Sequence, residues 1–265
     1  MHIFGFDLTL WQVVVLVLVA FLIGFSKTGV IGLGIVMTPL LVSAFPTGLS
    51  LGFIVPLSLF GDMLTIVKYR HKVVLRPLRK ALPWGIAGTL LGWQIAAAIG
   101  RAFGPAADGK LRVLIGFLML AVVLLGFYIA RHPRMAMAQK TSENAPRVRS
   151  WYAASLGSFA GIVGMLTNSG GTIWGVYFSS LGLEVKEIIG TVVWCYAIVA
   201  LVKMPLSANL GFLTLNSLYL NIILTPVVVA GILVGPSFSN RFDKAKFGTL
   251  TRTLALLGSL YMILS

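Results

Sequence analysis

The stretches Ser26-Lys27-Thr28-Gly29 and Thr167-Asn168-Ser169-Gly170-Gly171-Thr172 each interrupt a long apolar run, one in each half of the chain. Both stretches are polar and rich in glycine. Hydrocarbon offers backbone amides and carbonyls no hydrogen-bond partner, so irregular backbone survives at membrane depth only where it is buried in protein or lines a cavity. Paired interruptions are typical of secondary transporters whose substrate site lies near the bilayer midplane. The two stretches therefore predict a transporter with a central site.

The composition is that of an integral membrane protein. Apolar residues make up 58% of the 265 residues and charged residues only 11%, whereas soluble domains carry about 25% charge. The formal charge of +14 would indicate nucleic-acid binding in a soluble protein. Here we interpret it as basic loops that orient the chain in the membrane. We predict an all-α, multi-pass protein of the cytoplasmic membrane that contacts the lipid bilayer and binds no nucleic acid.

Eight apolar stretches predict the membrane segments. Six of them have the length of one crossing, about 20 residues, and lie at 48–67, 81–99, 111–128, 188–206, 215–235 and 248–264. The other two, 8–45 and 150–183, are nearly twice as long and contain the two interruptions. We predict that each folds as a helical hairpin, built either from two short re-entrant helices or from two full crossings. This gives eight to ten membrane segments in all.

Basic residues predict the orientation of these segments. They gather in three loops, 68–80, 131–149 and 238–247. The positive-inside rule places all three loops in the cytoplasm. The connections 100–110 and 207–214 carry less charge and fall outside, as do both termini. These assignments are mutually consistent along the whole chain.

The orientation predicts an internal symmetry. The first hairpin enters the membrane from outside and the second from the cytoplasm. Each half is one hairpin plus three crossings, and an odd number of crossings inverts the second half. We predict a bundle of two inverted repeats, 1–130 and 150–265, joined by a cytoplasmic linker at 131–149 within one membrane domain.

A weak sequence repeat agrees with this symmetry. An offset of 141 residues places Ser26-Lys27-Thr28-Gly29 on Thr167-Asn168-Ser169-Gly170. An offset of 143 places Gly88 and Gly92 on Gly231 and Gly235. Because small residues four positions apart let membrane helices approach closely, we interpret these glycines as packing residues.

Lys27 points most directly to a ligand. A cation at membrane depth costs roughly 2.5–3.5 kcal/mol even on the lenient insertion scale, so a lysine there faces a cavity or a partner. Ser26 and Thr28 add hydroxyl donors, and Gly29 exposes backbone amides. A short helix beginning near Val30 would also direct its N-terminal dipole at an anion. The alternative interpretation is a lysine that snorkels to the interface beside glycines used for packing.

The second interruption adds donors without charge. The candidate ligands are the side chains of Thr167, Asn168, Ser169 and Thr172 and the backbone of Gly170 and Gly171. Together with the first interruption they predict a donor-rich, acceptor-poor cage with one positive charge. Such a cage suits a small oxyanion.

Three other residues lie within the apolar segments. Asp62 has three candidate roles: an ion pair with Lys27, a site for a coupling proton, or a cap of its helix close to Lys68. We interpret Lys203 as an anchor near the outer end of its segment, with a role in the transport pathway as the alternative. Tyr196 is interpreted as a packing or interface aromatic.

Enzyme chemistry finds no support in the sequence. The histidines, His2, His71 and His132, lie at the terminus or in loops, so Ser169 has no candidate base. An aspartyl protease needs two membrane aspartates, and Asp62 stands alone. No spacing resembles a metal site or a phosphate-binding loop. We therefore predict neither an enzyme nor a bound cofactor or metal.

The opening interruption is also familiar as a motif. The stretch from Gly24 through Ser26-Lys27-Thr28-Gly29, Gly32 and Gly34 to Pro39 resembles the opening motif of the sulfite exporter TauE/SafE family. Gly61-Asp62, Tyr69-Arg70 and the glycine-rich start of the second half resemble it too, and the likeness covers nearly the whole chain. The resemblance implies a secondary transporter of sulfite, sulfonates or related sulfur-containing organic anions in the cytoplasmic membrane.

The combined prediction is a secondary active transporter of a small sulfur-containing oxyanion that works by alternating access. A passive anion channel and a non-transporting membrane subunit that scaffolds a partner are the alternatives. The sequence leaves open which anion is moved and in which direction. Coupling to protons or to sodium and assembly into a homo-oligomer are left open as well.

Overall fold

Helices make up nearly all of the chain that the computed structural model describes, which is residues 2–3, 6–28, 33–131, 150–241 and 244–264. A two-residue antiparallel strand pair, β1 (His2–Ile3) and β2 (Phe6–Asp7), comes first. The helices are α1 (Leu10–Thr28), α2 (Gly34–Val42), α3 (Thr47–Tyr69), α4 (Leu75–Phe103), α5 (Ala107–Arg131), α7 (Ser150–Thr167), α8 (Gly170–Ser179), α9 (Val185–Asn209), α10 (Leu215–Arg241) and α11 (Lys244–Leu264). Single 3-10 turns, Arg70–Lys72 and Gly104–Ala106, join α3 to α4 and α4 to α5.

The predicted fold class is confirmed. Five helical stretches among the described residues are long and apolar enough to cross a membrane, and α4 and α5 together form one of them. Large apolar side chains remain exposed on the outer helices, for example Ile222 at 67% and Leu233 at 71% on α10. Apolar exposure of this extent marks a surface that meets lipid rather than water.

The two hairpins differ from both alternatives that the sequence left open. In the first hairpin α1 has 19 residues and α2 has 9, and in the second α7 has 18 and α8 has 10. At about 1.5 Å per residue, the long arm of each reaches roughly 27–29 Å and the short arm roughly 13–15 Å. Each hairpin therefore pairs a crossing-length helix with a half-length helix.

The turn of the second hairpin shows how the sequence ends a helix at this depth. The Thr167 hydroxyl donates to the Val163 carbonyl at 2.7 Å and accepts from the Ser169 amide at 3.1 Å. Asn168 has a positive φ of 55°, a conformation that asparagine tolerates better than most residues. The chain thus leaves α7 at Thr167 and starts α8 at Gly170 with the donors of the turn partly satisfied within it.

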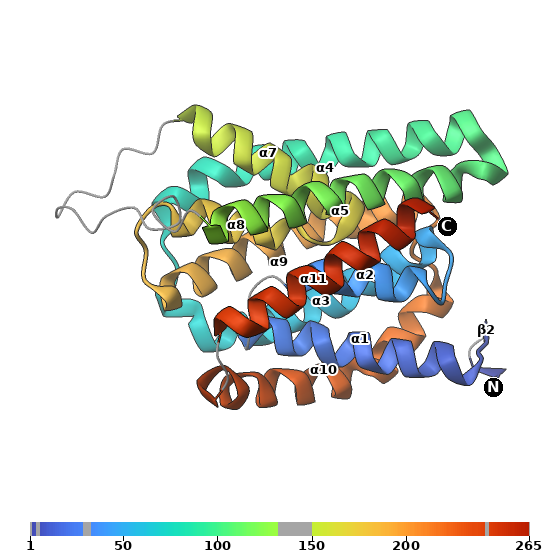
Figure 1. Ribbon diagram of the computed structural model, residues 1–265, viewed down its shortest axis with the longest axis horizontal. Coiled ribbons are helices and arrows are strands. Elements are labelled where there is room, and N and C mark those ends of the chain that lie inside the picture. Colours follow the sequence, from blue (N-terminus) through green and yellow to red (C-terminus); the bar gives the residue numbers. More distant parts are fainter. Residues whose placement is uncertain (1, 4–5, 29–32, 132–149, 242–243, 265) are drawn as a thin grey trace.

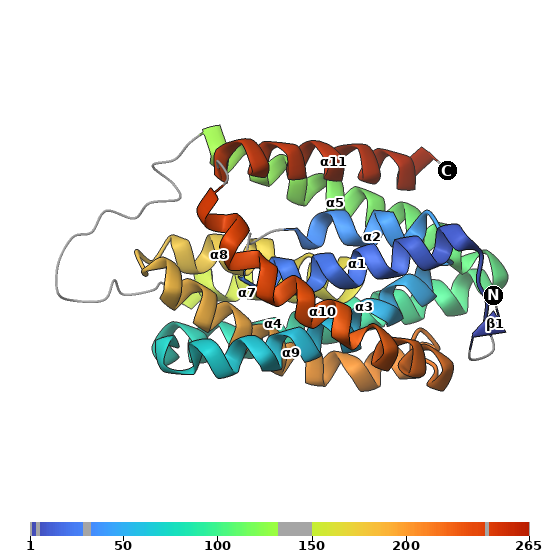
Figure 2. The same cartoon turned by 90° about the horizontal axis from the view of Figure 1, so that it is seen from below.

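The helices lie side by side along one axis, with α3 and α9 in mutual contact. Figure 1 shows both termini at one end of the bundle, where α1 begins, while α7 begins at the opposite end. In Figure 2, α11 lies along α5 at the edge of the bundle. The long arm of each hairpin packs against the fourth helix of the other half, α1 against α10 and α7 against α4. The inverted-repeat relation itself stays a prediction.

Glycines allow these two helix pairs to approach closely. A Cβ on Gly88 of α4 would lie 2.1 Å from the Ser158 carbonyl oxygen of α7. A Cβ on Gly231 of α10 would lie 2.2 Å from the Phe21 carbonyl oxygen of α1. Neither backbone atom can move aside like a flexible side chain. The interpretation of Gly88 and Gly231 as packing residues is confirmed.

Candidate functional site

The two interruptions meet inside the bundle. The Thr38 hydroxyl of α2 donates to the Thr167 carbonyl at 2.6 Å, and a Cβ on Gly34 would lie 3.2 Å from the Asn168 carbonyl oxygen. A cavity of about 70 Å³ lies where they meet. It is lined by Ile23, Ser26, Lys27, Gly34, Met37, Ile54, Ser58, Asp62, Asn168, Ser169, Gly171, Thr172, Ile189, Val192, Val193 and Tyr196. This central cavity is our candidate site.

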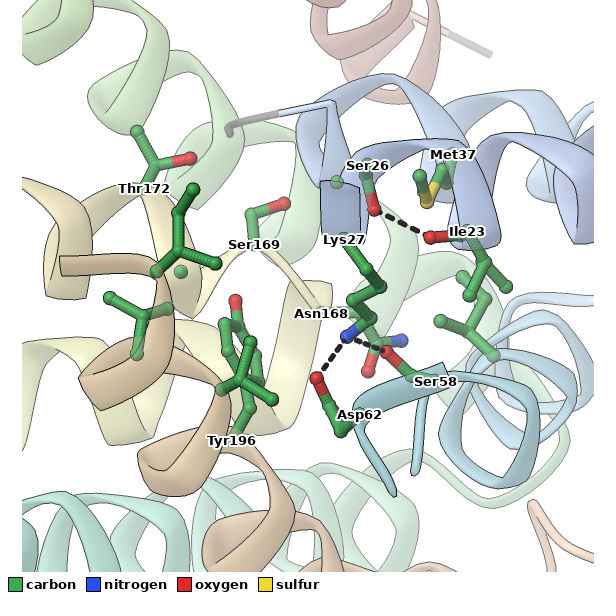
Figure 3. A pocket seen from close by; sticks show the side chains of 16 residues that line it. Ile23, Ser26, Lys27, Met37, Ser58, Asp62, Asn168, Ser169, Thr172 and Tyr196 are labelled. Atoms are coloured by element: carbon green, nitrogen blue, oxygen red, sulfur yellow. Dashed lines mark hydrogen bonds and ion pairs between the residues drawn. The ribbon is translucent and has the colours of Figure 1, made fainter. Parts of the chain in front are cut away.

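Lys27 reaches across the central cavity from α1 to α3 (Figure 3). Its Nζ lies 2.7 Å from Asp62 Oδ1 and 3.0 Å from Ser58 Oγ. The same Nζ lies 4.9 Å from the centre of the Tyr196 ring on α9, within cation–π range. The lysine therefore does not snorkel to the interface but lies inside the bundle with a partner.

The ion pair changes the expected electrostatics of the site. The Lys27 side chain is 10% exposed and the Asp62 side chain is fully buried. Of the three candidate roles of Asp62, the ion pair is the one the structure shows. The predicted acceptor-poor cage with one positive charge is wrong in this respect, since the carboxylate lines the cavity and neutralises the lysine. Asp62 Oδ2 is buried without a hydrogen-bond partner among the described residues.

Two donors of residues that line the central cavity have no hydrogen-bond partner among the described residues. Thr172 Oγ1 and Asn168 Nδ2 are both buried and have no hydrogen-bond partner in the described part of the chain. Buried polar groups of this kind usually find a partner. The hydroxyls of Ser26 and Ser169 also line the cavity, but they donate to the Ile23 and Thr167 carbonyls.

Some predicted ligands lie elsewhere. The Thr28 hydroxyl donates to the Ile232 carbonyl of α10 at 2.8 Å. The Thr167 hydroxyl donates to the Val163 carbonyl of its own helix. Neither residue lines the central cavity. Gly170 packs against α7, where a Cβ would lie 2.5 Å from the Ala160 carbonyl oxygen. Gly29 and Val30 lie outside the described residues, and the described short helix α2 begins at Gly34.

Sequence reasoning missed three polar residues around the site. Ser58 lies one helical turn before Asp62 on α3, a spacing that could have identified it. Tyr196 lines the central cavity, and a Cβ on Gly171 would lie 2.2 Å from its hydroxyl oxygen. Lys203 is 4% exposed and donates to the Gly164 carbonyl at 2.6 Å and to Asn168 Oδ1. The interpretation of Lys203 as an interface anchor is therefore wrong.

The described residues contain no cluster of three or more His, Cys, Asp or Glu side chains that could hold a metal ion. The candidate ligands are instead a paired lysine, hydroxyls and an amide, which are donors suited to an oxyanion.

Long apolar helices, half-length hairpin arms and a cavity with several polar side chains where those arms meet define the class: a multi-pass membrane protein. The sequence model of the sulfite exporter TauE/SafE family matches residues 16–262, so the chain belongs to this family of membrane anion transporters. A search of the curated proteins and of the solved structures found no match.

Proposed function

We propose that the protein is a secondary active transporter of a small sulfur-containing oxyanion, with sulfite or a sulfonate as the substrate and the central cavity as the binding site. The observation that supports this most is Lys27, a largely buried cation that lines the cavity together with Thr172 and Asn168, whose Oγ1 and Nδ2 have no hydrogen-bond partner among the described residues. Family membership supports the same class of substrate.

The chemistry of the cavity fits an oxyanion. Sulfite offers only acceptor oxygens, and Lys27, Thr172 and Asn168 offer N–H and O–H donors. Charge-assisted hydrogen bonds of this kind are roughly twice as strong as neutral ones. In this proposal the anion and the Asp62 carboxylate are alternative partners of Lys27. The apolar side chains Met37, Ile54 and Val192 complete the wall of the cavity.

Alternating access is the proposed mechanism. The order of helices in 1–130 recurs in 150–265, and the long arm of each hairpin packs against the fourth helix of the other half. Motion of one half against the other would open the cavity first to one side of the membrane and then to the other.

Counterflow in liposomes distinguishes an alternating-access transporter from a passive anion channel. Purified protein is reconstituted, the liposomes are loaded with unlabelled sulfite, and uptake of labelled sulfite is measured. A transporter accumulates label transiently in exchange for internal sulfite and saturates as external sulfite rises, whereas a channel does neither. Thermal stabilisation by sulfite, sulfate, thiosulfate and sulfonates then ranks the substrates. Absence of flux and of stabilisation for every one of these anions would refute the proposal.

Two isosteric variants separate ligand donors from structural ones. Thr172→Val should leave the melting temperature unchanged or raise it, because its hydroxyl has no partner among the described residues. It should weaken sulfite binding by about tenfold or more, since a hydrogen bond to a charged group contributes about 1.5–3 kcal/mol. Thr28→Val should behave oppositely, losing about 1 kcal/mol of stability with sulfite affinity unchanged. Unfolding and calorimetric titration of both variants check this, and equal affinities would contradict it.

A further inference from the structure

A second cavity adjoins the central one. It has a volume of about 30 Å³ and lies between α3, α7, α8 and α9. Its lining comprises Val55, Ser58, Ala160, Gly164, Asn168, Gly170, Trp174, Tyr196, Val199, Ala200 and Lys203. Ser58, Asn168 and Tyr196 line both cavities and so form the partition between them. An anion that crosses this partition leaves the surroundings of Lys27 and enters those of Lys203.

Lys203 is a buried cation to which no described carboxylate provides a counter-charge. Its side chain donates to two neutral acceptors, the Gly164 carbonyl and Asn168 Oδ1. No carboxylate among the described residues lies within ion-pair distance of it, whereas Lys27 is paired with Asp62. An unpaired charge at membrane depth is costly and usually marks a path for ions or substrate. By holding Asn168 Oδ1, Lys203 also fixes the orientation in which the free Nδ2 donor is buried between the cavities.

The contacting pairs Lys27–Asp62 and Asn168–Lys203 occupy related positions in the two halves. Residues 27 and 168 differ by 141, the offset that aligns the two interruptions, and residues 62 and 203 differ by the same number. In both halves the contacting partners are therefore 35 positions apart. The first half places the cation on the hairpin and a carboxylate on α3. The second half places an amide on the hairpin and the cation on α9, so the contact is kept but neither of its two partners is an acid.

We propose that Lys203 forms a second anion subsite, in series with the Lys27 subsite and separated from it by the Ser58–Asn168–Tyr196 partition. The ligand is the same small oxyanion, so this inference rests on the proposed function. Lys27 selects the anion in the central cavity. Lys203 attracts it through the partition, because the neutral acceptors that hold Lys203 give way to an anion more readily than a carboxylate would.

The test compares Lys203→Gln and Lys203→Arg in sulfite counterflow and in sulfite binding. Lys203→Gln should lower the maximal rate by about tenfold or more, because one charge-assisted contact along the path is lost. It should change the sulfite dissociation constant by no more than about threefold, since the Lys27 subsite is intact. Lys203→Arg keeps the charge and should retain most of the rate. Lys186→Gln, an exposed lysine on the same helix, is the matched control and should match the wild type.

Lys203→Met keeps the test decisive if Lys203→Gln folds poorly. Methionine fills a similar volume and removes the buried charge, so this variant should fold about as well as the wild type while losing flux. Unchanged flux in a folded Lys203→Gln or Lys203→Met protein overturns the second subsite, as does a Lys203→Arg protein as slow as Lys203→Gln. Loss of sulfite binding in Lys203→Gln as complete as in Lys27→Gln overturns the series arrangement. Absence of sulfite flux in the wild type refutes the proposed function instead.

Discussion

Replacing Lys27 with methionine should lower the free energy of unfolding by about 3–5 kcal/mol, because it leaves the fully buried Asp62 carboxylate without its partner. Methionine fills a similar volume, so the loss of stability reflects the missing charge rather than a new cavity. The variant should also lose sulfite flux and sulfite-dependent thermal stabilisation, since the anion loses its cationic ligand. Equilibrium unfolding in detergent and counterflow in liposomes measure the two effects.

A double variant distinguishes the loss of stability from the loss of sulfite flux. Lys27→Met with Asp62→Leu replaces the whole ion pair by apolar side chains, a change that is often neutral or stabilising for a buried pair. The double variant should therefore recover most of the lost stability but none of the sulfite flux. A stable double variant that still exchanges sulfite would show that Lys27 has a structural role alone.

The glycine contact between α4 and α7 gives the second large expected effect. Gly88→Ala places a Cβ 2.1 Å from the Ser158 carbonyl oxygen, so the two backbones have to separate. Overpacking of this kind typically costs about 1–3 kcal/mol, and we expect the upper end because the contact is with backbone. Thermal unfolding of the purified variant measures the loss.

Gly100→Ala on the same helix is the matched control. Gly100 is exposed, and a Cβ there meets no atom within 4 Å. Alanine has the higher helix propensity, so this variant should be as stable as the wild type or up to about 1 kcal/mol more stable. Equal melting temperatures for Gly88→Ala and Gly100→Ala would contradict the close approach of α4 and α7.

The sequence predicted the helices and the place where the site forms. Long apolar runs identify membrane helices because lipid demands internally satisfied backbone. The two interruptions were recognisable for the same reason, and the structure brings Lys27 and Asn168 of these stretches to one cavity. Asp62 was noticed because a charge in an apolar segment needs a partner.

Other features depend on tertiary contacts that periodicity does not encode. The direction in which a hydroxyl points is one example: Thr28 faces α10 and Thr172 faces the cavity, although both belong to the interruptions. Lys203 was misread because its position near the end of a segment resembles that of an interface anchor. The offset that aligns it with Asp62 gains meaning only once both residues are seen to contact the paired interruptions.

The position of a bound selenite ion tests the central claim most directly. Selenite is the selenium counterpart of sulfite, and its anomalous scattering locates it without ambiguity in a crystal of the protein. We predict one strong peak in the central cavity, within about 3.2 Å of Lys27 Nζ and Thr172 Oγ1. Selenite that competes with sulfite for transport but binds outside this cavity, away from Lys27, would contradict the account.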